Sequence, residues 1–294
     1  METITFIQQF ASPTLDHFFR WMSELGGTQA YIILLLGAYL ALDARLGQRL
    51  GIFVLVGFYL NFHLKGLVGT ERPFLLEPAV ARTPEAIPTS GPGFPSGHAQ
   101  LSLTFWGYAA WWLKRRWFWV LALFIVTFIS LSRLYLGMHF LVDVVGGLVI
   151  GAAYTAAAAF AEPFWVSLRS ISRALRAAVG FLTPLVLLLV LPPPGLEVSL
   201  IMGALAAFGS APLLMPYTPP KGLWQRLLIA LVGTALVFAA LSVSSLLLSE
   251  AVKRSAAGGF FRYAFIAYIG LYLTPWLAQA ARLAPKPQRA YAQG

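Results

Sequence analysis

The sequence predicts an all-α integral membrane protein with a helical core and four further spans behind it. Hydrophobic residues make up 59% of the 294 and charged residues only 11%, whereas a soluble domain has about 25% charged residues. The mean hydropathy is +0.74, so lipid is the main solvent. A spanning helix needs roughly 20 mostly apolar residues. Nine segments fit, at about 27–43, 49–65, 98–114, 116–133, 138–160, 177–192, 197–216, 224–248 and 260–281.

Residues 14–25, before the first span, have the pattern of an amphipathic helix. A polar face opposes an apolar face, which at helical spacing holds Leu15, Phe18, Phe19, Met22 and Leu25. Such a helix lies in the membrane interface with its apolar side in the lipid. We therefore expect an interfacial helix here, next to the first span.

The loop charges predict the orientation, because Lys and Arg gather on the cytoplasmic side. With nine spans, one set of loops holds thirteen of them: Arg45, Arg49, Lys114, Arg115, Arg116, Arg169, Arg173, Arg176, Lys221, Arg226, Arg282, Lys286 and Arg289. The other set holds five, once three motif cations are set aside: Arg20, Arg82, Lys253, Arg254 and Arg262. The C-terminus is thus predicted to be cytoplasmic. The net charge of +10 follows from this topology, so no nucleic-acid partner is expected.

Three polar motifs stand out in this apolar chain and fall together on the predicted outer, non-cytoplasmic face. They are Lys65 with Arg72-Pro73, then Pro95-Ser96-Gly97-His98, then Ser132-Arg133 with His139 and Asp143. Polar and ionisable residues within a membrane are functional by default. We take these motifs as one candidate site.

The cations and the helix start in these motifs suit a phosphate group. Lys65 offers a point charge, while the planar guanidinium groups of Arg72 and Arg133 can each bind two oxygens. Ser96 and Gly97 stand where the third span begins, so their N–H groups point at an anion from a helix N-terminus. These five residues are the predicted phosphate-binding set.

The remaining motif residues suit nucleophilic and acid catalysis. His139 and Asp143 are four residues apart at a helix start, so the carboxylate can fix the tautomer of the imidazole and leave one nitrogen free to attack. His98 is the candidate acid that protonates the leaving oxygen. A metal is the competing interpretation of two His and one Asp, but the neighbouring cations would repel it. We predict no metal and no other cofactor.

This ordered set resembles the type 2 phosphatidic acid phosphatase superfamily over about residues 14–155. The family pattern is Lys-x6-Arg-Pro, Pro-Ser-Gly-His and Ser-Arg-x5-His-x3-Asp, and every position is filled here. The resemblance implies a helical membrane core and metal-independent hydrolysis through a phosphohistidine, with roles that match those above. Soluble vanadium haloperoxidases share such a site, but the hydrophobicity of this chain argues against them.

Within that superfamily, bacterial envelope phosphatases look most similar, which implies a bacterial-type inner or plasma membrane. Their substrates are phosphatidic acid, phosphatidylglycerol phosphate or undecaprenyl diphosphate, so we expect membrane lipids as partners and a lipid phosphate or diphosphate as substrate. The run at 91–99 is also similar to glucose-6-phosphatase, which leaves a soluble sugar phosphate as the alternative. A transporter or scaffold with a phosphate pocket is the non-catalytic alternative.

The expected domains are a catalytic core at 1–160, a cytoplasmic amphipathic linker at 161–176 and a four-helix membrane region at 177–294. The last region has no comparable polar set; it can shape the substrate entrance, form a homodimer surface or carry a separate function. Residues 74–94 are expected to form a long irregular loop, either a lid over the site or a solvated connector.

The orientation can be tested with single cysteines, because the chain has none. We expect Glu85→Cys to react with a membrane-impermeant maleimide in intact cells, since the loop at 74–94 is predicted to be outside. We expect Arg115→Cys to react only after the membrane is permeabilised. The opposite pattern of labelling would invert the predicted topology.

Overall fold

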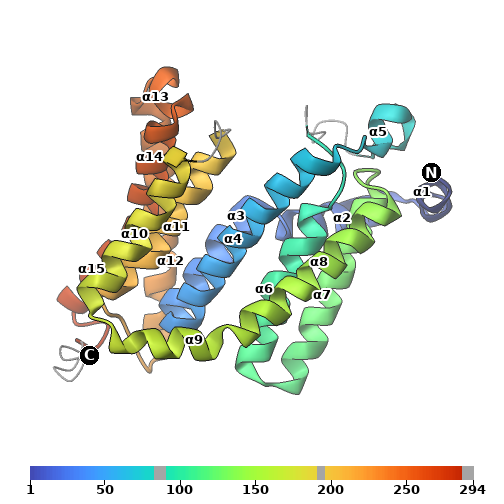
Figure 1. Ribbon diagram of the computed structural model, residues 1–294. Coiled ribbons are helices and arrows are strands. Elements are labelled where there is room, and N and C mark those ends of the chain that lie inside the picture. Colours follow the sequence, from blue (N-terminus) through green and yellow to red (C-terminus); the bar gives the residue numbers. More distant parts are fainter. Residues whose placement is uncertain (83–90, 191–195, 287–294) are drawn as a thin grey trace. The chain divides into compact units, whose positions relative to one another are not determined.

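The computed structural model describes residues 1–82, 91–190 and 196–286, and over these residues the protein is helical without any β-strand (Figure 1). The first elements are α1 (Glu2–Gln8), α2 (Pro13–Leu25), α3 (Thr28–Gly37), the π-helix η1 (Ala38–Leu42), α4 (Ala44–Val68), α5 (Pro73–Leu76), the 3₁₀-helix η2 (Pro78–Val80), α6 (Gly97–Leu113), α7 (Arg116–Tyr135) and α8 (Leu141–Phe160). The rest are α9 (Glu162–Ser167), the 3₁₀-helix η4 (Leu168–Ser170), α10 (Arg173–Val190), α11 (Leu196–Leu214), α12 (Leu223–Leu247), α13 (Glu250–Arg254), α14 (Ala256–Tyr268), the π-helix η5 (Ile269–Leu273) and α15 (Thr274–Ala280).

Seven helical segments of the described chain are long and apolar enough to cross a membrane. The helix α2 and the helix formed by α3 and η1 pass the same test as a pair, with a bend of 57° between them. If this pair acts as one broken span, it is the eighth candidate span. The expected third span, α6, has 17 residues and is not among them. An all-α membrane protein is therefore confirmed, whereas the count of nine spans stays a prediction.

The chain divides into two compact units. Unit 1 contains Met1–Tyr31 and Gly57–Ala161, and unit 2 contains Ile32–Val56 and Glu162–Gly294. The division near Ala161 lies beside the expected boundary at 160. Residues 32–56, which we expected in the N-terminal core, cluster with the C-terminal helices instead.

In unit 1, α6 packs between α7 and α8 (Figure 1). Two glycines of α8 allow the close approach: a Cβ on Gly147 would lie 2.5 Å from the Ser96 carbonyl oxygen, and one on Gly151 would lie 2.7 Å from that of Gln100. This four-residue spacing of small residues is typical of tightly packed membrane helices. It brings the start of α8 next to the start of α6.

A buried network of hydrogen bonds also links α4 to α6. The Asn61 amide donates to Gln100 Oε1 at 2.8 Å and to the Pro95 carbonyl at 3.3 Å, and Gln100 Nε2 donates to the Gly57 carbonyl at 3.0 Å. In an apolar medium such groups must be satisfied internally. The network therefore fixes the segment that enters α6.

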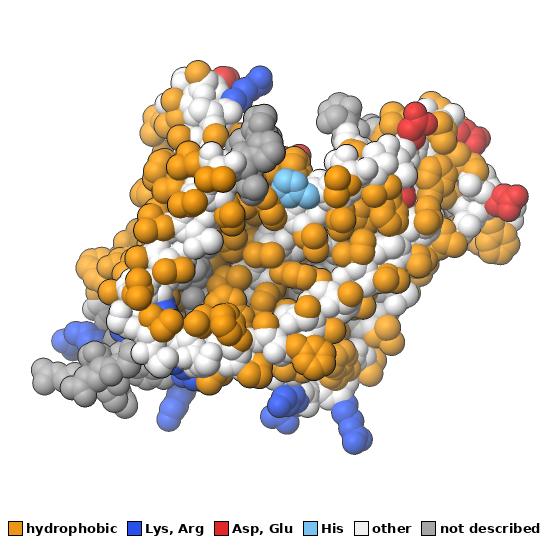
Figure 2. All heavy atoms as spheres, viewed as in Figure 1, with side chains coloured by type: hydrophobic (Ala, Val, Ile, Leu, Met, Phe, Trp, Pro, Cys, Tyr) orange, Lys and Arg blue, Asp and Glu red, His pale blue; other side chains and the backbone are white. Residues whose placement is uncertain are grey.

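The opposite end of α6 carries the basic turn at Lys114, Arg115 and Arg116, whose side chains are exposed (Figure 2). Lys114 ends the helix in the left-handed conformation, with φ of 52°. A helix of 17 residues is about 25 Å long at 1.5 Å per residue. The basic turn and the start of α6 thus lie on opposite sides of unit 1.

The prediction of an irregular loop at 74–94 is wrong for the first part of that segment. Residues 73–80 form α5 and η2, and Gln8 of α1 donates to the Val80 and Tyr135 carbonyls, both at 2.8 Å. Arg82 makes two hydrogen bonds to Asp16, at 2.7 and 2.8 Å. This segment is therefore anchored to α1 and α2, while residues 83–90 lie outside the described part.

In unit 2, α11 packs against α10 and α14. Small residues again permit the contact, since a Cβ on Gly203 would lie 2.1 Å from the Phe260 carbonyl oxygen, and Ala207 and Ala211 are fully buried. The two π-helices are also joined, because the Tyr39 hydroxyl of η1 donates to the Leu271 carbonyl of η5 at 3.3 Å. These contacts give unit 2 its own core.

The α6–α8 contact can be tested by adding one methyl group. We expect Gly151→Ala to lower the free energy of unfolding by about 1–3 kcal/mol, because the new Cβ meets backbone that cannot move aside. Gly66→Ala is the matched control, since a Cβ there meets nothing within 4 Å; it should be neutral or stabilising by up to about 1 kcal/mol. Thermal unfolding in detergent measures both, and equal effects would contradict the packing argument.

Candidate active site

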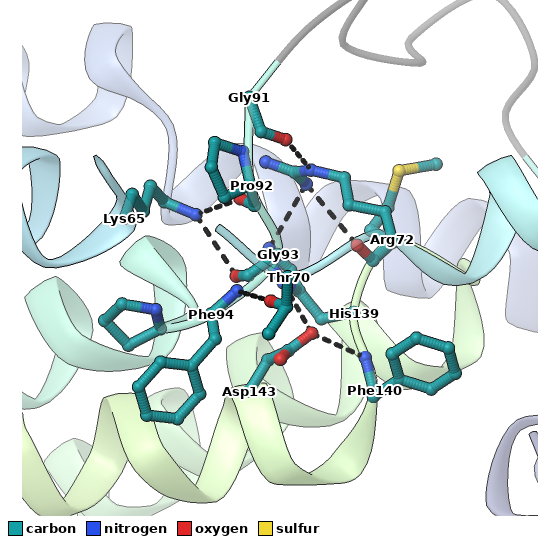
Figure 3. A network of polar contacts seen from close by, with 12 residues as sticks. Lys65, Thr70, Arg72, Gly91, Pro92, Gly93, Phe94, His139, Phe140 and Asp143 are labelled. Atoms are coloured by element: carbon teal, nitrogen blue, oxygen red, sulfur yellow. Dashed lines mark hydrogen bonds and ion pairs between the residues drawn. The ribbon is translucent and has the colours of Figure 1, made fainter. Parts of the chain in front are cut away.

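Lys65 and Arg72 lie at the end of α4 and just before α5, and both bind backbone carbonyls of the segment 91–93 (Figure 3). Lys65 Nζ donates to the Pro92 and Gly93 carbonyls at 2.7 and 3.2 Å. Arg72 Nε donates to the Gly91 carbonyl at 2.9 Å, and its Nη1 lies 3.4 Å from the Met138 carbonyl. These acceptors are neutral, so they orient the cations without cancelling their charge.

The second motif forms the start of α6. Ser96 is the N-cap residue, and its N–H donates to the Asp143 carbonyl at 2.9 Å. Its Oγ is buried and has no hydrogen-bond partner in the described part of the chain. The first N–H groups of a helix lack intrahelical acceptors, so those at the start of α6, where Gly97 and His98 follow Ser96, are suited to an anion.

His139 and Asp143 lie where α7 ends and α8 begins (Figure 3). Asp143 Oδ2 accepts from the Phe140 N–H at 2.9 Å and lies 3.4 Å from His139 Nδ1. On the other side of the ring, Arg72 Nη1 lies 3.4 Å from His139 Nε2. This geometry favours a proton on Nδ1, toward Asp143, and a free electron pair on Nε2. Both contacts are long for hydrogen bonds, as is common before substrate binds.

The surroundings of His139 keep its ring neutral. Burial is the main reason that its pKa lies well below the ordinary value of 6.5, and the positive charges of Arg133, Arg72 and Lys65 add to this effect. A neutral imidazole has the free electron pair that a nucleophile needs. The ring of His139 is thus neutral at neutral pH.

The third cation, Arg133, is in the last turn of α7 and is buried. Its Nη1 donates to the hydroxyl of Ser23 in α2, and its Nε has no partner in the described residues. Its positive charge, together with those of Arg72 and Lys65, acts on His98. The structure therefore brings all eight predicted site residues into one cluster in unit 1.

Sequence reasoning missed several residues that support this cluster. Thr70 accepts from the Phe94 N–H at 2.7 Å through its hydroxyl and from the Gly93 N–H at 2.8 Å through its carbonyl. Asn61 and Gln100 hold Pro95, as described above. A signal for Asn61 and Gln100 was present, since each is a polar residue within an apolar helix. Ser23 had none, because serine is ordinary in an amphipathic helix.

The apolar face of α2, which we expected in lipid, packs in part against α7. Phe18 contacts Phe128 edge to face with ring centroids 5.3 Å apart, and Phe19 stacks on Tyr135 at 4.4 Å. Both phenylalanines are half-buried, so protein covers part of this face. The exposed apolar residues beside the site cations are instead on α4 and α5: Leu67, Val68, Leu75 and Leu76.

The charges of this cluster suit an anion. It contains three cations and one buried carboxylate, Asp143. Among the described residues, no three His, Asp or Glu side chains gather in the way that a metal ion would need. Ser96 Oγ and Arg133 Nε have no hydrogen-bond partner in the described part of the chain, and phosphate oxygens are suitable acceptors for such donors.

The family comparison agrees with this geometry. A family model described as the PAP2 superfamily matches residues 47–167, the segment that contains all three motifs. No curated protein and no solved structure matches the chain. The local similarity to glucose-6-phosphatase therefore stays a prediction.

Proposed function

Residues 47–167 match the family model of the PAP2 superfamily, and from this premise we propose that the protein is a membrane phosphatase that hydrolyses a lipid phosphate or lipid diphosphate. The reaction needs no metal and passes through a phosphohistidine at the outer face of the membrane. One observation carries the proposal: His139 Nε2 faces Arg72, while Nδ1 faces the buried carboxylate of Asp143. A nucleophile is thereby aimed at the place where a phosphate would bind.

The residues can perform both halves of the hydrolysis. The negative charge of the bound substrate offsets the cations, so that His98 carries a second proton. His139 Nε2 attacks phosphorus, the bond to the leaving oxygen breaks, and the protonated His98 gives that oxygen its proton. Asp143 stabilises the positive charge that forms on the ring. A water then attacks the phosphorus as His98 takes its proton, the P–N bond breaks, and inorganic phosphate leaves with both histidines restored.

The three cations take the part that metal ions play in many phosphoryl-transfer enzymes. The transferred group keeps its negative charge throughout, so catalysis consists largely of positioning and charge stabilisation. Lys65, Arg72 and Arg133 supply three positive charges, and the start of α6 adds N–H donors. A divalent cation would be repelled by the same charges.

The surroundings of the pocket favour a lipid over a sugar phosphate. The exposed leucines and valine on α4 and α5 stand two to four residues from Lys65 or Arg72, where an acyl or prenyl chain can contact them. Each CH₂ removed from water contributes about 0.8 kcal/mol. A sugar needs hydroxyl-binding groups, and Arg82, the described candidate, is already engaged by Asp16; Thr83, Glu85 and Thr89 lie outside the described residues.

The nucleophile can be tested by trapping phosphate on the protein. After brief reaction with a ³²P-labelled substrate and denaturation in alkaline detergent, we expect label on the wild type and none on His139→Ala, whose turnover should fall by about 10³-fold or more. Asp143→Asn should be impaired but still labelled. His63→Ala is the control, because this exposed imidazole of α4 lies outside the cluster. Label that persists in His139→Ala would move the nucleophile elsewhere.

The substrate class can be tested by comparing kcat/KM in one detergent with EDTA present. We expect long-chain lipid phosphates or diphosphates to exceed glucose 6-phosphate by at least tenfold, because the tail adds apolar contact. Vanadate should inhibit both reactions by mimicking five-coordinate phosphorus. Equal or higher kcat/KM for glucose 6-phosphate would overturn the lipid assignment, and an activity that appears only after Mg²⁺ replaces EDTA would overturn the metal-free mechanism.

A further inference from the structure

The last turn of α2 and the glycine that follows it lie beside two groups of the site, on α7 and α6. The Ser23 hydroxyl accepts a hydrogen bond from Arg133, and Gly26 stands next to the His98 ring. We propose that this end of α2 is a positioning element of the reaction: Ser23 orients the Arg133 guanidinium, and Gly26 provides the space in which the His98 ring stands. The inference rests on the proposed phosphatase function and adds residues outside the three motifs.

The contact of Ser23 with Arg133 orients the cation without neutralising it. Arg133 Nη1 donates to the Ser23 hydroxyl, and Arg133 forms no ion pair with any carboxylate of the described residues. Glu24, the next residue, is exposed and acts on Arg133 through its charge, without an ion-pair contact. A carboxylate partner would cancel the charge that the phosphate needs, whereas a hydroxyl satisfies one donor and leaves the charge available. The buried Nε remains without a partner and free for a phosphate oxygen.

Position 26 requires glycine because neighbouring atoms leave no room for a side chain, and not because its backbone conformation demands glycine. Its φ of −93° and ψ of 3° are accessible to other residues. A Cβ on Gly26 would lie 2.8 Å from His98 Cδ2 and 3.0 Å from Ile129 Cγ2. Because real contacts of this kind are longer, any larger residue must displace the imidazole or the turn. Gly26 therefore sets how far the His98 ring can extend toward α2.

Ordinary helix packing does not account for these two contacts. The aromatic pairs of Phe18 with Phe128 and Phe19 with Tyr135 already hold α2 on α7. Ser23 and Gly26 add little apolar contact, and their partners are the polar groups to which we assign charge stabilisation and proton donation. Their substitution should therefore change the chemistry more than the stability.

The role of Gly26 can be tested with two leaving groups. A displaced His98 fails to protonate an alkoxide, whereas p-nitrophenolate leaves without a proton. We expect Gly26→Ala to lower kcat for an alkyl phosphate by about 10–100-fold and kcat for p-nitrophenyl phosphate by less than about threefold. Gly37→Ala is the matched control, since a Cβ there meets nothing within 4 Å. Equal losses on the two substrates, or no loss, would overturn the role of Gly26.

The role of Ser23 can be tested by phosphate binding, which does not depend on turnover. We expect Ser23→Ala to weaken the binding of inorganic phosphate by about tenfold, because one oriented hydrogen bond is lost, and Ser23→Thr to restore it. Thr14→Ala, an exposed hydroxyl of the same helix, should change nothing. Unchanged binding in Ser23→Ala would overturn this role. A wild type that binds phosphate but releases none from any substrate would instead overturn the proposed function, and the role of Gly26 with it.

Discussion

The site depends on the close contact between the first turns of α6 and α8. Gly147 and Gly151 have no Cβ, so the backbone of α6 can lie directly on α8, and the Ser96 N–H reaches the Asp143 carbonyl. This contact places the start of α6, with Ser96 and its neighbours, beside the turn that carries His139. A wider separation would leave His98 and His139, the proposed acid and nucleophile, too far apart to act on one phosphate group.

The second constraint is the placement of three cations in an apolar protein. Burial of an unpaired charge is costly, and the usual remedy is a carboxylate. Here Lys65 and Arg72 bind carbonyl oxygens of residues 91–93, and Arg133 binds a hydroxyl. These partners satisfy hydrogen-bond donors, and the charge of Asp143 also acts on Lys65 and Arg72. The same bonds fix the segment 91–93, so the chain that leads into α6 and the cations that face it hold each other in position.

Much of this arrangement could be predicted from the sequence, because the strongest signals are local. Apolar length predicted the long helices, and the unusual polarity of the motifs predicted which residues gather. The helices within residues 74–80 were mispredicted as part of an irregular loop, because this segment is held by bonds to Gln8 and Asp16, far away in sequence. The packing of Phe18 and Phe19 against α7 was missed for a similar reason: an amphipathic pattern shows that a helix has an apolar face, but not whether lipid or protein covers it. The grouping of residues 32–56 with the C-terminal helices had no local signal at all.

The charges of the site suggest an order of events that suits a histidine nucleophile. Before binding, burial and the three cations keep His139 neutral, so its Nε2 retains its electron pair. A phosphate monoester brings nearly two negative charges, which offset the cations and remove their unfavourable effect on a positive ring. In the proposed reaction, the ring carries both the phosphoryl group on Nε2 and the proton on Nδ1 after attack, and Asp143 lies on the side where that positive charge develops. The substrate would thus balance the cations that keep His139 neutral before binding, and the carboxylate would stabilise the ring only once the new bond has formed.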